Sequence, residues 1–236
     1  MTAPAPAVRA APTAEVLGPL PCPERLLTNA ERSRLAGLGR PASRADFLAA
    51  HVLVRQCVAD LTGGDPADVV VVQRCRSCGG PHGRPRVARA YVSLSHSDGL
   101  VAAVAAAVPV GVDVQRLPWR FASGGADARL LAASCTPRES GVVQRSATPA
   151  VDFVHAWAGK ESLVKVGAFA LDAAAGVDLL RPGGAERSAR CGRWWVRSWA
   201  PGAGPAGAVV DAVVAVAWLS PAASPGRAVP WGRVRP

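Results

Sequence analysis

The 236-residue chain lacks a long apolar run and a segment typical of a secretory leader. Residues 1–20 contain Ala and Pro but no apolar stretch of the kind found in signal peptides. The longest apolar run, residues 100–112, is interrupted by Pro109 and is too short to cross a bilayer. We therefore expect a cytoplasmic protein with no membrane partner, and we expect its six cysteines to be reduced.

Lysine is almost absent. Lys160 and Lys165 are the only lysines among the 27 lysine and arginine side chains. The arginines are scattered from Arg9 to Arg235, without the blocks or interleaved aromatics typical of single-strand binders, so we expect no nucleic-acid partner. The abundance of Ala, Arg, Gly and Pro is typical of GC-rich coding, which makes the net charge of +10 a weak guide to function. The charge still favours acidic partners through long-range attraction.

Half of the residues are apolar, which excludes a chain that is disordered throughout. We expect a disordered N-terminal tail over residues 1–20 and a loose C-terminal tail over residues 220–236. Between them, residues 21–112 and 113–219 each contain a long helix followed by apolar strands. The pattern predicts an α+β fold of two α+β subdomains, with a cleft where they meet.

In the first half, apolar residues recur at helical spacing from Ser43 to Leu61, and Gly63-Gly64 ends the run. The β-branched run 69–72 predicts a buried strand. Residues 91–97 and 100–108, separated by a turn signal, predict a buried hairpin.

Gly111 to Leu117 predicts a strand on which Val112 and Val114 face one way while Asp113 and Gln115 face the other. An acidic residue between buried valines needs a partner, because an unpaired charge there is costly. A metal ion and a salt bridge are both possible partners.

The second half has further helix signals. Residues 126–134 are helical in pattern, and Thr136-Pro-Arg-Glu139 is a capping box with proline at the first helical position. The next helix carries Trp157, Glu161 and Lys165 on one face and ends at Gly167. Residues 194–199 and 209–219 predict a final hairpin.

Cys75, Cys78 and His82 lie in a Gly/Pro-rich segment that also contains Arg84. The three residues resemble half of a zinc knuckle, but a structural zinc site needs four ligands. One hypothesis is a small basic zinc protein that binds nucleic acid. We favour a loop that presents Arg84.

Four motifs follow one another along the chain: the basic Gly/Pro loop, Ser95-His96-Ser97, Gly111-Val-Asp113-Val, and Trp157-x-x-Lys-Glu-x-x-x-Lys-x-Gly167. In this order and spacing they resemble the Sfp-type 4′-phosphopantetheinyl transferases, over roughly residues 25–219. The resemblance implies two pseudo-twofold-related α+β subdomains in a monomer. It also implies Mg²⁺-dependent transfer of phosphopantetheine from coenzyme A to a serine of an apo acyl, peptidyl or aryl carrier protein, with release of 3′,5′-ADP.

The resemblance assigns Asp113 and Glu161 as Mg²⁺ ligands, and hard oxygen ligands suit this cation. Gln115 stands where many relatives carry a second carboxylate, and its amide oxygen can coordinate the ion or hold a metal-bound water. Glu161 is also the implied general base for the serine hydroxyl. Lys165 would neutralise charge on the α-phosphate of the leaving group, since an ammonium serves as a point charge on phosphate.

The remaining residues implied by the resemblance contact coenzyme A. They are Arg44 at the 3′-phosphate, Arg84-Pro85 as the basic-residue-Pro element, and Ser95, His96 and Lys160 near the phosphates. His96 is also counted with Glu161 and Lys165 among the catalytic residues.

Gln115 leaves the metal site with one negative charge fewer, from which we expect weaker or more Mg²⁺-dependent activity. Ala50-His51 and Ala158-Gly159 also depart from the usual residues of the family. The alternative hypothesis is a non-catalytic module that binds coenzyme A or a carrier protein.

Overall fold

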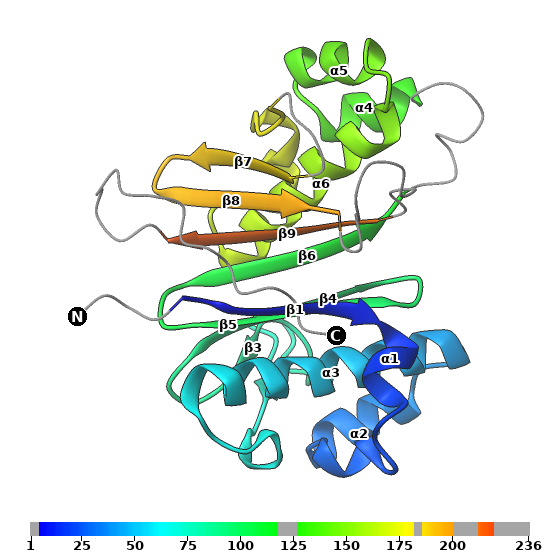
Figure 1. Cartoon of the computed structure of the whole chain (residues 1–236), viewed down its shortest axis with the longest axis vertical. Helices are drawn as coiled ribbons and strands as arrows, with labels where there is room; N and C mark the ends of the chain where they lie inside the picture. The colour runs from blue at the N-terminus through cyan, green and yellow to red at the C-terminus, as the bar shows by residue number, and fades with distance from the viewer. Residues whose placement is uncertain (1–4, 118–126, 182–185, 201–211, 220–236) are drawn as a thin grey trace. The chain divides into compact units, whose positions relative to one another are not determined.

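The computed structural model describes residues 5–117, 127–181, 186–200 and 212–219. They form an α+β protein of two compact units, one ending at Val110 and the other beginning at Gly111. Each unit packs a long helix against a sheet and is described here by itself (Figure 1). Within these residues, no helix combines the length and apolar character needed to span a membrane. The predicted loose tail at residues 220–236 lies outside the described residues.

The first unit is built on a three-stranded antiparallel sheet in the order β1-β5-β4. Its members are β1 (Ala7–Pro12), β4 (Tyr91–Ser97) and β5 (Leu100–Ala106). The central strand β5 is buried along its whole length. Asp98 and Gly99 join β4 to β5 with φ angles of 44° and 82°, as a tight two-residue hairpin requires. The predicted hairpin is therefore confirmed.

The predicted disordered tail is wrong for the part of residues 1–20 that the structure describes. Residues 7–12 pair with β5, and helix α1 (Thr13–Leu17) follows directly. Asp46 fixes this segment, because its buried carboxylate accepts hydrogen bonds from the Thr13 hydroxyl and the Gly99 N–H. An Ala/Pro-rich composition is compatible with an edge strand when the neighbouring strand offers free backbone groups.

Helix α3 (Pro41–Thr62) covers one face of this sheet and contacts all three strands. Proline begins the helix, and Gly63, with a φ of 73°, ends it in the left-handed conformation that favours glycine. The helix predicted from Ser43 to Leu61 is therefore confirmed and is slightly longer than expected. The other elements of the unit are η1 (Pro23–Leu26), α2 (Asn29–Ala36), η2 (Pro66–Asp68), β2 (Val72–Gln73) and β3 (Pro85–Arg86).

A buried ionic cluster joins α2 to α3. Glu31 accepts hydrogen bonds from Arg55 at 3.1 and 2.6 Å and lies 2.6 Å from His51 Nδ1. These partners lower the pKa of Glu31 to about 2 against the opposing effect of burial. His51 is thus a core residue of this unit.

The strand predicted at residues 69–72 is wrong, although Val71 is 2% exposed and belongs to the core. Only Val72 and Gln73 are in a strand, and Val70 and Val72 are 60% and 54% exposed. The short strand β2 pairs only with the short β3, so no second layer covers these valines. A β-branched run alone does not distinguish a core strand from a surface one.

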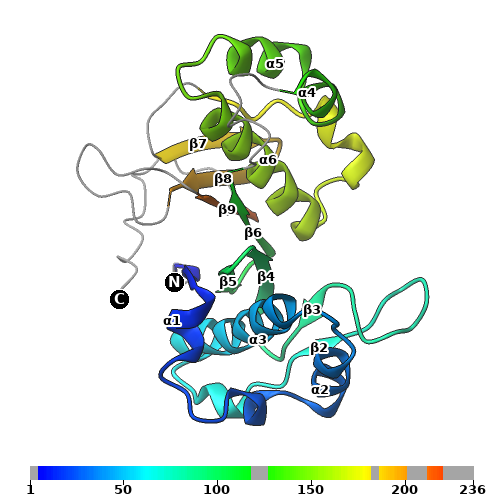
Figure 2. The same ribbon diagram turned by 90° about the vertical axis from the view of Figure 1, so that its right-hand side faces the viewer.

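The second unit has a four-stranded sheet in the order β6-β9-β8-β7, against which helix α6 (Pro149–Val166) packs. The strands are β6 (Val110–Arg116), β7 (Glu186–Cys191), β8 (Trp194–Trp199) and β9 (Ala212–Leu219). Helices α4 (Ala128–Ser134) and α5 (Pro137–Gln144) lie on the side of α6 away from the sheet (Figure 2). The β8–β9 hairpin was predicted, whereas β7 and η4 (Leu171–Gly176) were not.

The predicted start of α5 and the predicted ends of α4 and α6 are confirmed, whereas α4 begins at Ala128 and residue 126 lies outside the described residues. The side chain of Thr136 and that of Glu139 form the capping box of α5. Helix α6 ends at Gly167, whose φ of 85° favours glycine. Gly159 inside α6 marks close packing, since a Cβ there would lie 3.2 and 3.3 Å from side-chain atoms of Leu179 and Val196.

Candidate functional site

Strand β6 crosses helix α6 at unusually close range. A Cβ on Gly111 would overlap the carbonyl oxygen of Ser162 and lie 2.8 Å from the backbone nitrogen of Val166. Only glycine allows this approach of two backbones. Because side chains alternate along a strand, Asp113 and Gln115 leave β6 on the same side as the crossing point. The crossing thus directs Asp113 toward the last turns of α6.

Asp113 is held by two side chains of this unit. Lys165 Nζ donates to Asp113 Oδ1 at 2.6 Å, and Gln115 Nε2 donates to Oδ2 at 3.0 Å. Asp113 is buried, with 2% of its side chain exposed, while Lys165 is 28% exposed. A metal ion and a salt bridge were both possible partners for this buried carboxylate, and the structure contains a salt bridge to Lys165.

Glu161 belongs to the same cluster. The pKa of Glu161 is raised by burial and then by the negative charge of Asp113, while the positive charge of Lys165 opposes the increase. No described residue donates a hydrogen bond to its half-buried carboxylate. Two carboxylates and one ammonium therefore interact electrostatically in a single place, and one of the carboxylates lacks a donor.

The residues present suit a divalent cation with hard oxygen ligands. Asp113 and Glu161 supply carboxylate oxygens whose mutual repulsion a cation would relieve. Lys165 donates to Asp113 and so partly neutralises one of these two carboxylates within the unit. Gln115, a predicted metal ligand, contacts Asp113 through its amide nitrogen in this structure and orients that carboxylate.

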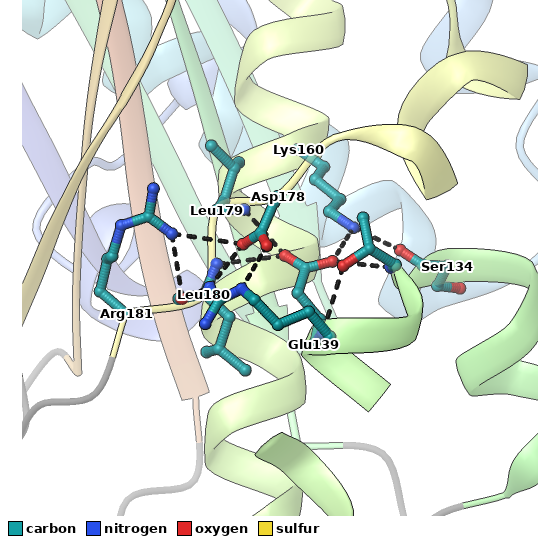
Figure 3. A network of polar contacts seen from close by, with 9 residues as sticks. Ser134, Glu139, Lys160, Asp178, Leu179, Leu180 and Arg181 are labelled. Carbon is teal, nitrogen blue, oxygen red and sulfur yellow. Dashed lines mark hydrogen bonds and ion pairs between the residues drawn. The ribbon is translucent and has the colours of Figure 1, made fainter. Parts of the chain in front are cut away.

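Lys160 has a different place from the one predicted. Its side chain is 0% exposed, and its ammonium donates to Glu139 Oε2 at 2.6 Å and to the Ser134 carbonyl at 2.7 Å (Figure 3). The predicted contact between Lys160 and a phosphate is corrected by this placement, because a fully buried ammonium presents no side to a ligand from solvent.

Glu139 is the centre of that network. Oε1 accepts hydrogen bonds from the backbone nitrogens of Leu179 and Leu180 at 2.8 and 3.1 Å, while Oε2 also completes the capping box with Thr136 (Figure 3). The pair of Glu139 and Lys160 therefore joins α5 to α6 and to the segment that follows η4. Its role is structural, and it supports the helix that carries Glu161 and Lys165.

The other predicted residues lie in the first unit. Arg44 is exposed on the first turn of α3, and Arg84 is exposed directly before Pro85, the first residue of β3. Partial burial and the charges of Arg86 and Arg76 lower the pKa of Arg84. On β4, His96 is exposed while its neighbour Ser95 is 7% exposed.

Two further clusters have no part in the predicted site. His155 Nδ1 lies 2.7 Å from Ser198 Oγ beneath α6, and burial lowers the pKa of this imidazole to about 4. Beside it, Arg187 forms a buried ion pair with Asp152. Contacts of this range, 43 residues apart for His155 and Ser198, leave no local sequence signal. The second cluster is Cys75, Cys78 and His82, whose ligand atoms lie together on the first unit.

In comparisons with known proteins, no protein-family model matches the chain and no curated protein matches it.

Proposed function

We propose that the chain is a 4′-phosphopantetheinyl transferase of the Sfp type, which acts on a serine of an apo carrier protein. The observation that carries this proposal is the meeting of Asp113, Glu161 and Lys165 where β6 crosses α6. The motifs that supply these residues resemble the family in their order and spacing along the sequence. The ion pair of Lys165 with Asp113, and the response of the Glu161 pKa to the charges of both residues, support the proposal.

The architecture is compatible with the proposal. Each unit packs one long helix, α3 or α6, against a sheet, as in a pair of related α+β subdomains. We propose that the two units are related by a pseudo-twofold axis. The chain's net charge of +10 suits an acidic carrier protein, which long-range attraction would bring to its surface.

In the proposed reaction, the serine oxygen bonds to the phosphorus nearer the pantetheine, and the pyrophosphate bond to 3′,5′-ADP breaks. Glu161 takes the serine proton, and its raised pKa makes it a stronger base than an ordinary carboxylate. Lys165, which is 28% exposed, would neutralise charge on the departing phosphate. A Mg²⁺ ion held by Asp113 and Glu161, with Gln115 beside them, would neutralise the pyrophosphate oxygens.

Coenzyme A would be held mainly by charge. We assign Arg44 to the 3′-phosphate and Arg84, Ser95 and His96 to the pyrophosphate region, with Pro85 shaping the loop. Arg44, Arg84 and His96 are exposed, so a ligand from solvent can reach them. Lys160 is left out of this set because of its buried pair with Glu139.

The proposal is tested by incubating the protein with coenzyme A, Mg²⁺ and a panel of apo carriers from fatty-acid, polyketide and nonribosomal-peptide systems. Intact mass should show the addition of one phosphopantetheinyl group to at least one carrier, dependent on Mg²⁺. A protein that neither binds coenzyme A nor modifies any carrier would contradict the proposal.

A non-catalytic module that binds coenzyme A or a carrier protein is the second candidate. It is favoured by Gln115, which contributes no negative charge, and by the neutralisation of Asp113 by Lys165. Calorimetry that shows coenzyme A binding, together with no mass change in any carrier, would select this function.

A further inference from the structure

A compact group of metal-ligand side chains lies in the loop between β2 and β3 of the first unit. The ligand atoms of Cys75, Cys78 and His82 all lie within 4.8 Å of one another. The closest contact is between Cys78 Sγ and His82 Nε2, at 3.0 Å. All three residues are at least partly accessible to solvent.

The backbone of the loop forms a tight turn between Cys75 and Gly80. Gly79, with a φ of 71°, turns the chain so that its N–H reaches the carbonyl of Cys75 at 3.0 Å. The Cys75 N–H then donates to the carbonyl of Gly80 at 2.9 Å, which closes the turn.

Gly80 allows the second sulfur and the imidazole to converge. A Cβ at this position would lie 3.3 Å from Cys78 Sγ and 3.2 Å from His82 Cδ2. Most real Cβ contacts are longer, so a side chain at residue 80 would push the two ligands apart. The glycines of the segment therefore serve the cluster as well as the turn.

The chemistry of the three ligands selects the ion. Thiolates with an imidazole are typical ligands of Zn²⁺, whereas Mg²⁺ prefers oxygen. Bond lengths of about 2.3 Å to sulfur and 2.0 Å to nitrogen in a tetrahedron place ligand atoms about 3.5–3.8 Å apart. The observed cluster, within 4.8 Å, needs only small side-chain adjustments to reach this geometry.

We propose that Cys75, Cys78 and His82 bind one Zn²⁺ ion, with the fourth coordination position open to water. None of the His, Cys, Asp or Glu side chains in the described residues joins the three, so these residues give an open zinc site with three protein ligands and a water, not the four-ligand structural site. This site shares no residue with the cluster of Asp113 and Glu161, which belong to the other unit.

The ion would link three side chains of a loop that is otherwise held by its backbone hydrogen bonds and by the hydrogen bond from Gln73 Nε2 to the Gly83 carbonyl. Every residue from Arg76 to Gly79 and from Pro81 to Arg84 is exposed, so no buried apolar side chain anchors this segment. Arg84 follows His82 by two residues. If the proposed function is correct, zinc would therefore fix the segment that carries a coenzyme A contact.

The first test measures metal in the full chain. After purification and exchange into metal-free buffer, we expect one Zn²⁺ per chain, and Co²⁺ substitution should give the visible bands of a tetrahedral site with thiolate charge-transfer absorption. Bound Zn²⁺ absent even after supplementation, no cobalt spectrum, or a Cys75–Cys78 disulfide that forms in place of metal binding would each overturn the proposal.

The second test uses the exposed ligands, whose replacement leaves the core untouched. Cys78→Ser and His82→Ala should each lower Zn²⁺ affinity by at least about 100-fold in competition with a chromogenic chelator. Cys22→Ser, an exposed free cysteine elsewhere in the unit, is the matched control and should bind like the wild type. Equal losses in Cys22→Ser and Cys78→Ser would overturn the assignment. Because these measurements need no carrier protein, failure of the zinc proposal can be distinguished from failure of the proposed transferase function.

Discussion

Lys165 reaches from α6 to Asp113 on β6, with its ammonium 2.6 Å from a carboxylate that is 2% exposed. The same ammonium lowers the raised pKa of Glu161, one turn earlier on the helix. The Lys165 ammonium thus interacts with two carboxylates, and the four-residue spacing of Glu161 and Lys165 along the helix makes this possible.

Lys165→Ala should lower the free energy of unfolding by about 1–3 kcal/mol, because Asp113 would remain buried without its main partner. Asp113→Asn should cost less, since Lys165 is partly exposed and can turn to water. In the double variant the two effects should couple by at least about 0.5 kcal/mol, measured by urea unfolding. Strictly additive effects would mean that the pair does not interact in solution.

Glu161→Gln should leave stability at neutral pH unchanged or higher. Because the folded-state pKa of Glu161 is raised, the folded protein retains a proton that the unfolded chain has lost, and stability falls as pH rises through the folded pKa. The glutamine variant should lose this part of the pH dependence, measured as unfolding free energy from about pH 4 to 8. Glu15→Gln, at an exposed position of α1, is the control and should keep the wild-type profile. A marked loss of stability in Glu161→Gln would indicate a structural role instead.

Gly111→Ala should disturb the site through the backbone. The new methyl group would overlap the Ser162 carbonyl, so β6 must move away from α6 at a cost of about 1–3 kcal/mol or more. Gly176→Ala is the matched control, because a Cβ there meets nothing within 4 Å. Thermal unfolding of the two variants gives the comparison, and equal midpoints would contradict the close crossing.

Lys160→Ala should destabilise the protein by about 3–5 kcal/mol, because it leaves Glu139 charged and fully buried. Arg181→Ala is the control from the edge of the same network, since its pair with Asp178 is exposed and worth at most about 1 kcal/mol. Urea unfolding separates the two. If Lys160→Ala kept wild-type stability but weakened coenzyme A binding, Lys160 would contact a phosphate after all, and the structural role given to it would be contradicted.

Local signals predicted much of the second unit. The capping box of Thr136 and Glu139 and the glycine stop at Gly167 depend on neighbours within a few residues, and both are present. The partner of Lys160 could not be predicted in this way. Glu139 is 21 residues away, and the capping box already accounted for its carboxylate.

The other wrong predictions concern which segments pack against the rest of the protein. An Ala/Pro-rich composition indicated a disordered tail, but residues 7–12 gain their stability from pairing with β5, whose paired residues lie 88 to 98 positions further along the chain. The run of valines at residues 69–72 indicated a core strand, yet the structure places no layer over Val70 and Val72. For Asp113, the strand pattern correctly required a partner, and only the crossing at Gly111 determined that Lys165 supplies it.

The central claim is that Glu161 acts on the hydroxyl of a carrier serine, and the most direct measurement is the rate of transfer to an apo carrier followed by intact mass. With coenzyme A and Mg²⁺, the wild type and Glu15→Gln should add one phosphopantetheinyl group at similar rates. Glu161→Gln should be slower by at least about 100-fold while remaining folded. Transfer by Glu161→Gln at the wild-type rate, or no transfer by the wild type to any carrier tested, would contradict the account.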